Sequence, residues 1–175
     1  YEEALVFYDK ALEWAPSLRA ACLNKLFTYA RLGDKEAHGE WVEKVLEITE
    51  MLPSSLYMIG NSYLLLGDDE SSEKYYAELS QLGDWKNRVD HYRSTFCLES
   101  GLLNKALHFA KRAFDQNPND TSIRYHLSVC YSSLGEKDKA LEMLEKLGHA
   151  PEWLGYYRIT IDRDAEKHVE ASQTL

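Results

Sequence analysis

The sequence predicts an all-α fold in which pairs of antiparallel helices repeat every 34 residues. Two observations lead to this prediction. Gly33, Gly67, Gly101 and Gly135 stand 34 residues apart, and apolar residues at helical spacing precede and follow these glycines. Because glycine suits the left-handed conformation that ends many helices, each of the four marks a turn between two helices.

The hairpin around Gly135 shows the pattern most clearly. Its first helix carries one apolar stripe, formed by Ile123, Leu127, Cys130, Tyr131 and Leu134. Its second helix carries another stripe, formed by Ala140, Leu141, Leu144 and Leu147, and ends at Gly148. Both stripes fit 3.6 residues per turn, so each repeat is a helix, a tight turn and a helix.

Two sets of residues resemble the motif of the tetratricopeptide repeat family. The first-helix run W-x-x-L-G-x-x-Y is matched, with aliphatic residues in its first two places, by Leu56, Ile59, Gly60 and Tyr63. The second-helix pattern, A-x-x-x-F followed by a proline, is matched by Ala4, Tyr8, Ala11 and Pro16, and 102 residues later by Ala106, Ala110, Ala113 and Pro118. The resemblance implies a right-handed superhelical solenoid of antiparallel helix pairs.

In this register, residues 1–154 form the repeat array. A second helix stands alone at residues 1–18. Full repeats begin near residues 19, 53, 87 and 121. Residues 155–175 are expected to form a capping helix and tail, because a solenoid needs a polar cover on its last hairpin. Since the sequence opens at Tyr1 in the middle of a repeat, we expect it to be part of a longer protein.

Some residues depart from the family pattern. His38 stands where alanine is expected and Gly39 lies inside a helix, so this second helix is predicted to be longer or kinked. Lys25 and Arg93 occupy places where the family usually has leucine. Asp90 precedes Arg93 by three residues and is expected to pair with it on the same helix face.

Composition and charge argue against several classes of function. A net charge of -9 lacks the basic surface that a nucleic-acid-binding protein needs. No apolar run approaches the roughly 20 residues of a membrane span. The three cysteines are odd in number and lack a C-x-x-C spacing, so we expect free thiols and a cytoplasmic location. The sequence therefore predicts no nucleic acid and no membrane among its partners.

No group of residues predicts catalysis, and we expect neither an enzyme nor a bound cofactor or metal. The sequence has no glycine-rich phosphate loop, no H-E-x-x-H pair and no G-x-S-x-G turn. His91 and His126 lie on neighbouring first helices and are expected to line a groove. The acidic run of Asp68, Asp69 and Glu70 is expected at a helix start, where carboxylates favour the helix dipole.

Residues that point away from the core stripe predict a binding surface. Tyr125 and Val129 are four residues apart and face away from Ile123 and Leu127. The corresponding positions in earlier repeats extend this surface across four first helices, and in the family it is the concave groove that receives peptides. The predicted peptide-binding residues are Leu23, Phe27, Tyr57, Asn61, Arg88, His91, Tyr92, Thr95, Tyr125 and Val129.

Particular roles follow for these side chains. Tyr57 and Tyr125 are expected to be apolar anchors, because aromatic residues on rigid helices make strong contacts. Asn61 is expected to hydrogen-bond the peptide backbone, since its amide both donates and accepts. Arg88 and His91 would favour an acidic residue in the peptide. The leading prediction is thus a scaffold that binds an extended or helical segment of another protein.

Two other functions remain open. The chain can be the accessory repeat domain of a larger enzyme, such as a glycosyltransferase. It can also self-associate through its N-terminal half repeat, which offers an apolar face formed by Ala4, Leu5, Tyr8 and Leu12. The family's carboxylate clamp for chaperone tails is disfavoured, because Leu23, Tyr57 and His91 do not supply its lysine.

Overall fold

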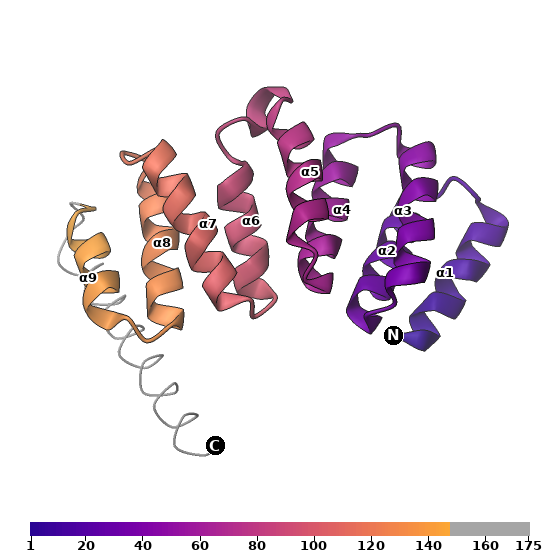
Figure 1. Ribbon diagram of the computed structural model, residues 1–175, viewed down its shortest axis with the longest axis horizontal. Coiled ribbons are helices and arrows are strands. Elements are labelled where there is room, and N and C mark those ends of the chain that lie inside the picture. Colours follow the sequence, from indigo (N-terminus) through magenta and orange to yellow (C-terminus); the bar gives the residue numbers. More distant parts are fainter. Residues whose placement is uncertain (148–175) are drawn as a thin grey trace, which may run out of the picture. The chain divides into compact units, whose positions relative to one another are not determined.

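The computed structural model describes residues 1–147, which form helices and contain no strand (Figure 1). The prediction of an all-α helical repeat fold is confirmed. The elements are α1 (Glu2–Trp14), α2 (Arg19–Leu32), α3 (Lys35–Thr49), α4 (Pro53–Leu66), α5 (Asp69–Ser80), the 3-10 helix η1 (Gly83–Trp85), α6 (Val89–Glu99), α7 (Leu103–Gln116), α8 (Thr121–Ser133) and α9 (Lys137–Glu145). The capping helix expected over residues 155–175 lies outside the described residues.

The same turn follows α2, α4, α6 and α8. Gly33, Gly67, Gly101 and Gly135 have φ angles of 74°, 73°, 75° and 75°. After α2, the Gly33 N–H donates to the Ala30 carbonyl at 3.2 Å, and the next N–H donates to the Tyr29 carbonyl at 3.1 Å. Equivalent bonds recur at the other three glycines. These pairs of bonds satisfy the last carbonyls of each helix, and the turns predicted from the 34-residue spacing are confirmed.

Aspartates directly precede and cap three of the described helices, namely Asp34 before α3, Asp68 before α5 and Asp120 before α8. Asp34 Oδ1 accepts a hydrogen bond from the Ala37 N–H, and Asp68 Oδ1 accepts one from the Ser71 N–H, each at 3.0 Å. Hydrogen bonds from Ser71 hold the pKa of Asp68 below its ordinary value. Asp68 therefore caps α5, and Asp69 and Glu70 lie in its first turn, as expected of an acidic run at a helix start.

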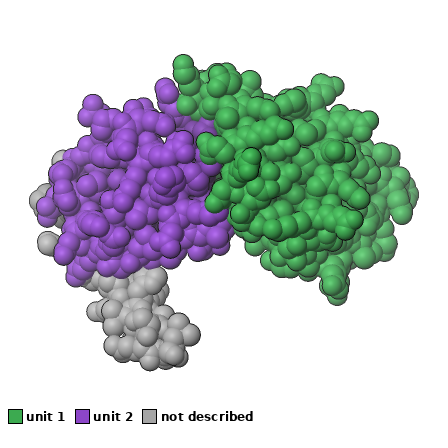
Figure 2. All heavy atoms as spheres, in the orientation of Figure 1, with its two compact units in different colours: residues 1–86 green, residues 87–175 purple. Residues whose placement is uncertain are grey.

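The chain forms two compact units, which Figure 2 shows in different colours. Unit 1 comprises residues 1–86; in it α2 packs against α1, α3 and α4, and α4 packs against α5. Unit 2 begins at residue 87; in it α7 packs against α6 and α8, and α8 packs against α9. Consecutive helices on either side of a turn glycine thus form the hairpins α2–α3, α4–α5, α6–α7 and α8–α9.

The unusual Lys25 and Arg93 are both buried against an aromatic ring. Lys25 Nζ lies 4.1 Å from the centre of the Trp41 ring, and the Arg93 guanidinium carbon lies 3.8 Å from the centre of the Phe109 ring. Lys25 and Arg93 occupy equivalent positions two repeats apart in the sequence, and so do Trp41 and Phe109. Because a cation above an aromatic face is attracted by the ring quadrupole, each pair joins the two helices of its hairpin.

Carboxylates accompany the two buried cations. Lys25 pairs with Asp9 of α1, which ties α1 to α2. Arg93 lies 3.5 Å from Asp90, and the expected pair is confirmed. Asp90 also forms an ion pair with Arg112, whose Nε lies 3.2 Å from the carboxylate. It accepts a hydrogen bond from Gln116 Nε2 at 2.9 Å. These contacts compensate the burial of a carboxylate that is 4% exposed.

His38 explains how α3 departs from the family pattern. At 15 residues, α3 is the longest helix in the described part of the chain, as the sequence predicted. The His38 side chain is buried and lies 2.8 Å from Ser62 Oγ of α4. The larger side chain thus joins α3 to the next hairpin, where the family's alanine would make no hydrogen bond.

No helix within residues 1–147 is both long and apolar enough to cross a membrane.

Candidate functional site

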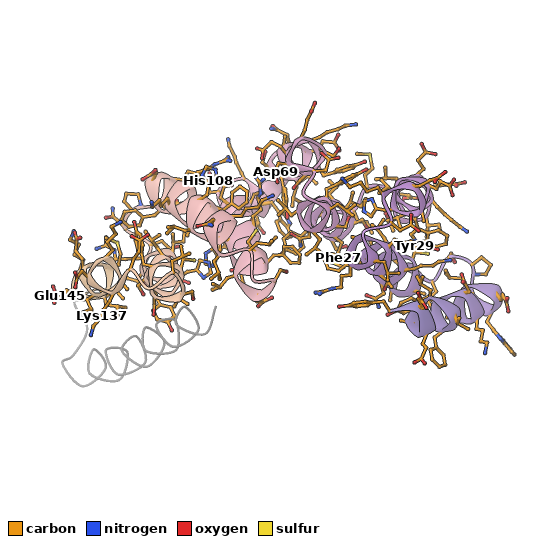
Figure 3. All side chains as sticks on the ribbon, turned by 60° about the horizontal axis from the view of Figure 1, so that its bottom comes forward. Phe27, Tyr29, Asp69, His108, Lys137 and Glu145 are labelled. Atoms are coloured by element: carbon orange, nitrogen blue, oxygen red, sulfur yellow. The ribbon has the colours of Figure 1, made fainter. Side chains whose placement is uncertain are left out.

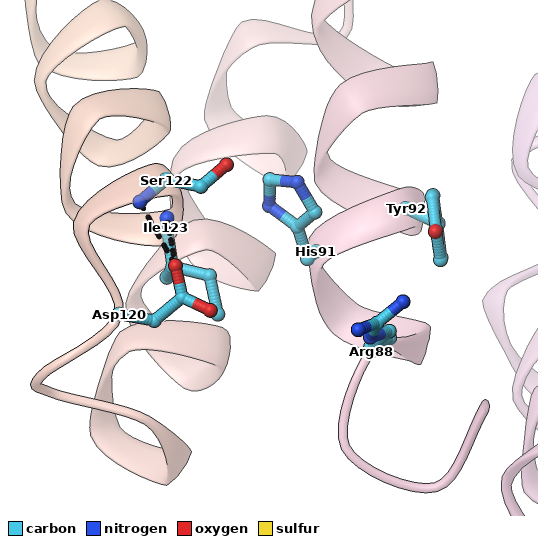
Figure 4. A pocket seen from close by; sticks show the side chains of 6 residues that line it. All are labelled: Arg88, His91, Tyr92, Asp120, Ser122 and Ile123. Carbon is cyan, nitrogen blue, oxygen red and sulfur yellow. Dashed lines mark hydrogen bonds between the residues drawn. The ribbon is translucent and has the colours of Figure 1, made fainter. Parts of the chain in front are cut away.

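A pocket with a volume of about 260 Å³ lies between the N-terminal ends of α6 and α8 in unit 2 (Figure 4). Figure 4 shows the α6 side chains on one wall and the α8 side chains on the other. The pocket is lined by Arg88, His91, Tyr92, Asp120, Ser122 and Ile123. It brings together three of the residues predicted from the sequence to bind a peptide, and it adds three that the sequence reasoning missed.

Local helix-start chemistry positions both walls. Arg88 directly precedes α6, so its side chain and those of the first turn project at the helix end. On the opposite wall, Asp120 precedes α8, and its Oδ1 accepts hydrogen bonds from the N–H groups of Ser122 at 2.8 Å and Ile123 at 3.2 Å. An aspartate before an apolar helical stripe is a typical capping signal, and it could have placed Asp120 at this end from sequence.

The pocket has a cation on one wall and a carboxylate on the other. Arg88 is exposed, and within the described residues it forms no ion pair. Burial lowers the pKa of His91; the Asp120 carboxylate opposes this shift, whereas the Arg88 cation adds to it. The Nδ1 atom of His91 is buried without a hydrogen-bond partner among residues 1–147. A ligand group can therefore reach the exposed Arg88, whereas the Nδ1 atom of His91 is covered by the protein.

A buried polar cluster lies behind His91. The His91 and His126 rings are 5.0 Å apart between centres, in an edge-to-face arrangement at 80°. His126 Nε2 lies 2.8 Å from Ser94 Oγ, and Ser94 Oγ donates to the Ala106 carbonyl at 2.7 Å. Because the Ser94 hydroxyl has a single hydrogen, Nε2 of His126 must be the donor to Ser94. The cluster thus fixes the tautomer of His126.

The same cluster is poorly suited to acid–base or nucleophilic chemistry. Burial, with a smaller contribution from the neighbouring His91, lowers the pKa of His126 to about 4. Burial raises the pKa of the Cys130 thiol to about 11, although Ser94 opposes the shift. Near neutral pH the imidazole is therefore neutral and the thiol is protonated. Within the described part of the chain, no three His, Cys, Asp or Glu side chains are placed to hold a metal ion.

In unit 1, the predicted residues divide into a surface pair and a buried pair. Phe27 and Tyr57 are half-buried on α2 and α4, which pack together. Phe27 lies on a different side of α2 from Tyr29, whose ring contacts Trp41 of α3 at 6.3 Å between centres (Figure 3). The Tyr57 ring lies 5.6 Å from the Trp85 ring and 6.3 Å from the Tyr76 ring. Both Phe27 and Tyr57 thus remain partly exposed on unit 1.

The other two predicted residues of unit 1 are covered. Leu23 is 9% exposed and Asn61 is 1% exposed. Asn61 Oδ1 accepts a hydrogen bond from the Tyr76 hydroxyl of α5. The expectation that Asn61 binds a peptide backbone is therefore wrong for its carbonyl group, because Tyr76 from the second helix of the hairpin already occupies it.

The remaining predicted residues of unit 2 lie outside the pocket. Thr95, Tyr125 and Val129 are half-buried on α6 and α8. The Thr95 hydroxyl donates to the His91 carbonyl at 3.1 Å, so it serves its own helix. The continuous surface predicted from the sequence would span both units, and it stays a prediction.

Comparison with known proteins identifies the repeat. Two tetratricopeptide repeat family models match residues 53–82 and residues 98–151. No curated protein sequence gives a significant match. The matched residues include α4 and α5 in unit 1 and α7, α8 and α9 in unit 2.

Several solved structures also resemble the chain at low sequence identity. YrrB, a TPR protein with an unusual peptide-binding site, is 18% identical over 93% of this chain and 87% of its own, with a TM-score of 0.44. MamA is 15% identical over 82% of this chain and 84% of its own, with a TM-score of 0.47. The human IFIT1 dimer with PPP-AAAA is 17% identical over 99% of this chain, with a TM-score of 0.48, and the chain spans 44% of its length.

The family assignment rests on the two repeat matches and on the helical hairpins with their recurring glycine turns. Tetratricopeptide repeats support a role in protein interaction. The chain belongs to the tetratricopeptide repeat family and is built as a protein-interaction repeat scaffold.

Proposed function

We propose that the chain binds a peptide segment of another protein, and that in unit 2 one acidic side chain of this peptide enters the pocket between α6 and α8. The observation that carries the proposal is the pocket itself, with an exposed arginine at its rim and a half-buried histidine at its centre. Arg88 and His91 are the groups that would bind the carboxylate.

The size of the pocket favours a side chain as its occupant. Its volume of about 260 Å³ is below the roughly 300 to 1,000 Å³ of most small-molecule sites. A peptide that places one residue in the pocket would leave its other residues to contact the neighbouring surface. Tyr92, which is 37% exposed, lies at this rim and offers an aromatic face.

The charges favour an acidic residue that approaches from the α6 wall. An arginine binds a carboxylate through two parallel N–H···O bonds, which gives direction as well as attraction. The Asp120 carboxylate on the α8 wall would repel a ligand carboxylate that approached it. This repulsion selects the orientation in which the ligand carboxylate lies toward Arg88.

Apolar contacts would supply much of the remaining affinity. Tyr57 in unit 1 and Tyr125 in unit 2 are both half-buried, so each keeps part of its ring available for a partner. We expect each to anchor an apolar residue of the peptide. Aromatic residues are over-represented among the side chains that dominate binding energy at protein interfaces.

The test begins with peptides selected from a random display library on the whole chain, followed by calorimetric titration of the strongest binder. Replacing Arg88, Tyr57 or Tyr125 by alanine should each weaken binding by roughly 1 to 3 kcal/mol. Lys111→Ala on the exposed side of α7 is the matched control and should bind normally.

Two further comparisons make the test sharper. Changing the acidic residue of the selected peptide to its amide should weaken binding to the unaltered chain but have little further effect on Arg88→Ala. If Arg88→Ala, Tyr57→Ala and Tyr125→Ala all bind normally while Lys111→Ala does not, the first helices do not form the binding site.

A further inference from the structure

The pocket between α6 and α8 has a charged side chain on each of its two walls. Arg88 is exposed on the α6 wall, and Asp120 is exposed on the α8 wall. Figure 4 shows the two side chains on opposite sides of the pocket. Within residues 1–147 neither of them forms an ion pair, with each other or with another residue. Each charge is therefore available to a ligand group of the opposite sign.

Asp120 uses only one of its two carboxylate oxygens to cap α8. The N–H groups of Ser122 and Ile123 both donate to Oδ1. In the described part of the chain Oδ2 accepts no hydrogen bond, and Figure 4 shows it on the side of the pocket. Arg124, one turn further along α8, does not neutralise this carboxylate, because its guanidinium donates to two backbone carbonyl groups at 3.1 and 2.6 Å.

The two charges favour a ligand that carries an acidic group and a basic group together. With the ligand carboxylate at Arg88 and the ligand cation at Asp120, both contacts are attractive. The reverse orientation brings like charges together on both walls. The net charge of -9 also works against a uniformly acidic partner, which the chain as a whole would repel. A segment with charges of both signs avoids this repulsion.

Helix spacing sets the separation between the two ligand charges. The helices α6 and α8 contact each other, and packed helices lie about 8 to 10 Å apart between their axes. An extended peptide advances by about 3.3 Å per residue. A peptide that crosses from the α6 wall to the α8 wall therefore covers the distance in about two or three residues.

We propose that the peptide bound in this pocket carries a lysine or arginine about two or three residues from its acidic residue, and that Asp120 binds this cation. Asp120 is then a specificity-determining residue as well as the cap of α8. The inference rests on the proposed function, because it takes the acidic residue to be bound by Arg88. It adds a second charge requirement that separates a segment of mixed charge from a purely acidic one.

The probe is a synthetic library of short acetylated peptides in which one central glutamate is fixed and the other positions are randomised. Acetylation removes the charge of the amino terminus, so that every cation is a side chain. A second library of the same design keeps the free amino terminus. Both are selected on the unaltered chain and on Asp120→Asn, since asparagine removes the charge but is an equally good helix cap. The matched control is Asp34→Asn, which changes the cap of α3 in unit 1.

Peptides selected on the unaltered chain should be enriched in lysine or arginine at the stated distance from the glutamate. This enrichment should disappear on Asp120→Asn and persist on Asp34→Asn. One selected peptide is then labelled with a fluorophore and titrated by anisotropy. Replacing its basic residue by glutamine should weaken binding to the unaltered chain roughly twofold to fivefold at low salt, as expected of one exposed ion pair. The same replacement should have little effect on binding to Asp120→Asn.

Three results would overturn the inference and leave the proposed function standing. The first is binding that depends on the glutamate and on Arg88 but shows no preference for a basic residue. The second is a basic preference that Asp120→Asn retains, or that Asp34→Asn loses as well. The third is a preference met only by the free amino terminus of the second library. If Arg88→Ala binds every selected peptide normally, or no peptide is selected, the proposed function fails and the inference fails with it.

Discussion

Acid should destabilise unit 1 through His38. This side chain is 1% exposed, and its Nε2 lies 2.8 Å from Ser62 Oγ. The Ser62 hydroxyl donates to the Ile59 carbonyl at 2.7 Å, so His38 must be the donor to Ser62. The Tyr63 ring lies 4.7 Å away, edge-to-face with the imidazole. Protonation would place a positive charge in this enclosed position.

The magnitude follows from the pKa. Burial lowers the pKa of His38 from the ordinary 6.5 to about 4, and the Asp68 carboxylate only partly opposes the shift. Since one pKa unit corresponds to about 1.36 kcal/mol, full protonation of the folded state costs about 3 kcal/mol relative to the unfolded chain. Because the folded pKa is the lower one, the unfolded state binds more protons between pH 6.5 and 4. Stability therefore falls as the pH drops through this window, by about 2 kcal/mol at pH 5.

The assay compares urea unfolding at pH 7 and pH 5 for the unaltered chain and His38→Gln. Glutamine keeps a side-chain donor but does not titrate. Trp41 lies on α3 with His38, so tryptophan fluorescence reports the same unit. Between pH 7 and pH 5, the free energy of unfolding of His38→Gln should fall by about 2 kcal/mol less than that of the unaltered chain.

The matched control is His108→Gln, which changes an exposed histidine on α7 (Figure 3). It should retain the pH dependence of the unaltered chain. If the unaltered chain and His38→Gln lose the same free energy of unfolding between pH 7 and 5, the neutral buried donor assigned to His38 is wrong.

Three further predictions concern packing. A Cβ at Gly60 would meet the Tyr76 ring at 2.9 Å, so Gly60→Ala should destabilise the fold by roughly 1 to 3 kcal/mol in thermal melts. A Cβ at Gly39 would have nothing within 4 Å, so Gly39→Ala should stabilise the fold by roughly 0.5 to 1 kcal/mol in the same assay. Arg93→Leu should destabilise by roughly 1 to 3 kcal/mol in urea titrations, because it removes the contact of the guanidinium with the Phe109 ring and one of the two cations beside the buried Asp90, while Arg112 remains; unchanged or increased stability would contradict this. The amides of α1 should exchange with deuterium faster than those of α4, since α1 buries no residue, and equal protection in a monomer would refute this.

The sequence by itself determined the repeat and its turns. The four glycines at 34-residue spacing all adopt the left-handed conformation, because a helix end is fixed by bonds within about six consecutive residues. The capping role of Asp68 is equally local. The Asp90–Arg93 pair was also predictable, since residues three apart on a helix are neighbours whatever else surrounds them.

Only the tertiary structure decided which of the outward-facing residues stay accessible. Asn61 lies four residues from Tyr57 on the same face of α4, as helical spacing requires, yet Tyr76 of α5 binds and covers it. The pocket in unit 2 depends on Asp120 lying across from Arg88, and the two are 32 residues apart in sequence. Periodicity places a residue on a face of its own helix, whereas accessibility depends on the side chains that neighbouring helices bring to that face.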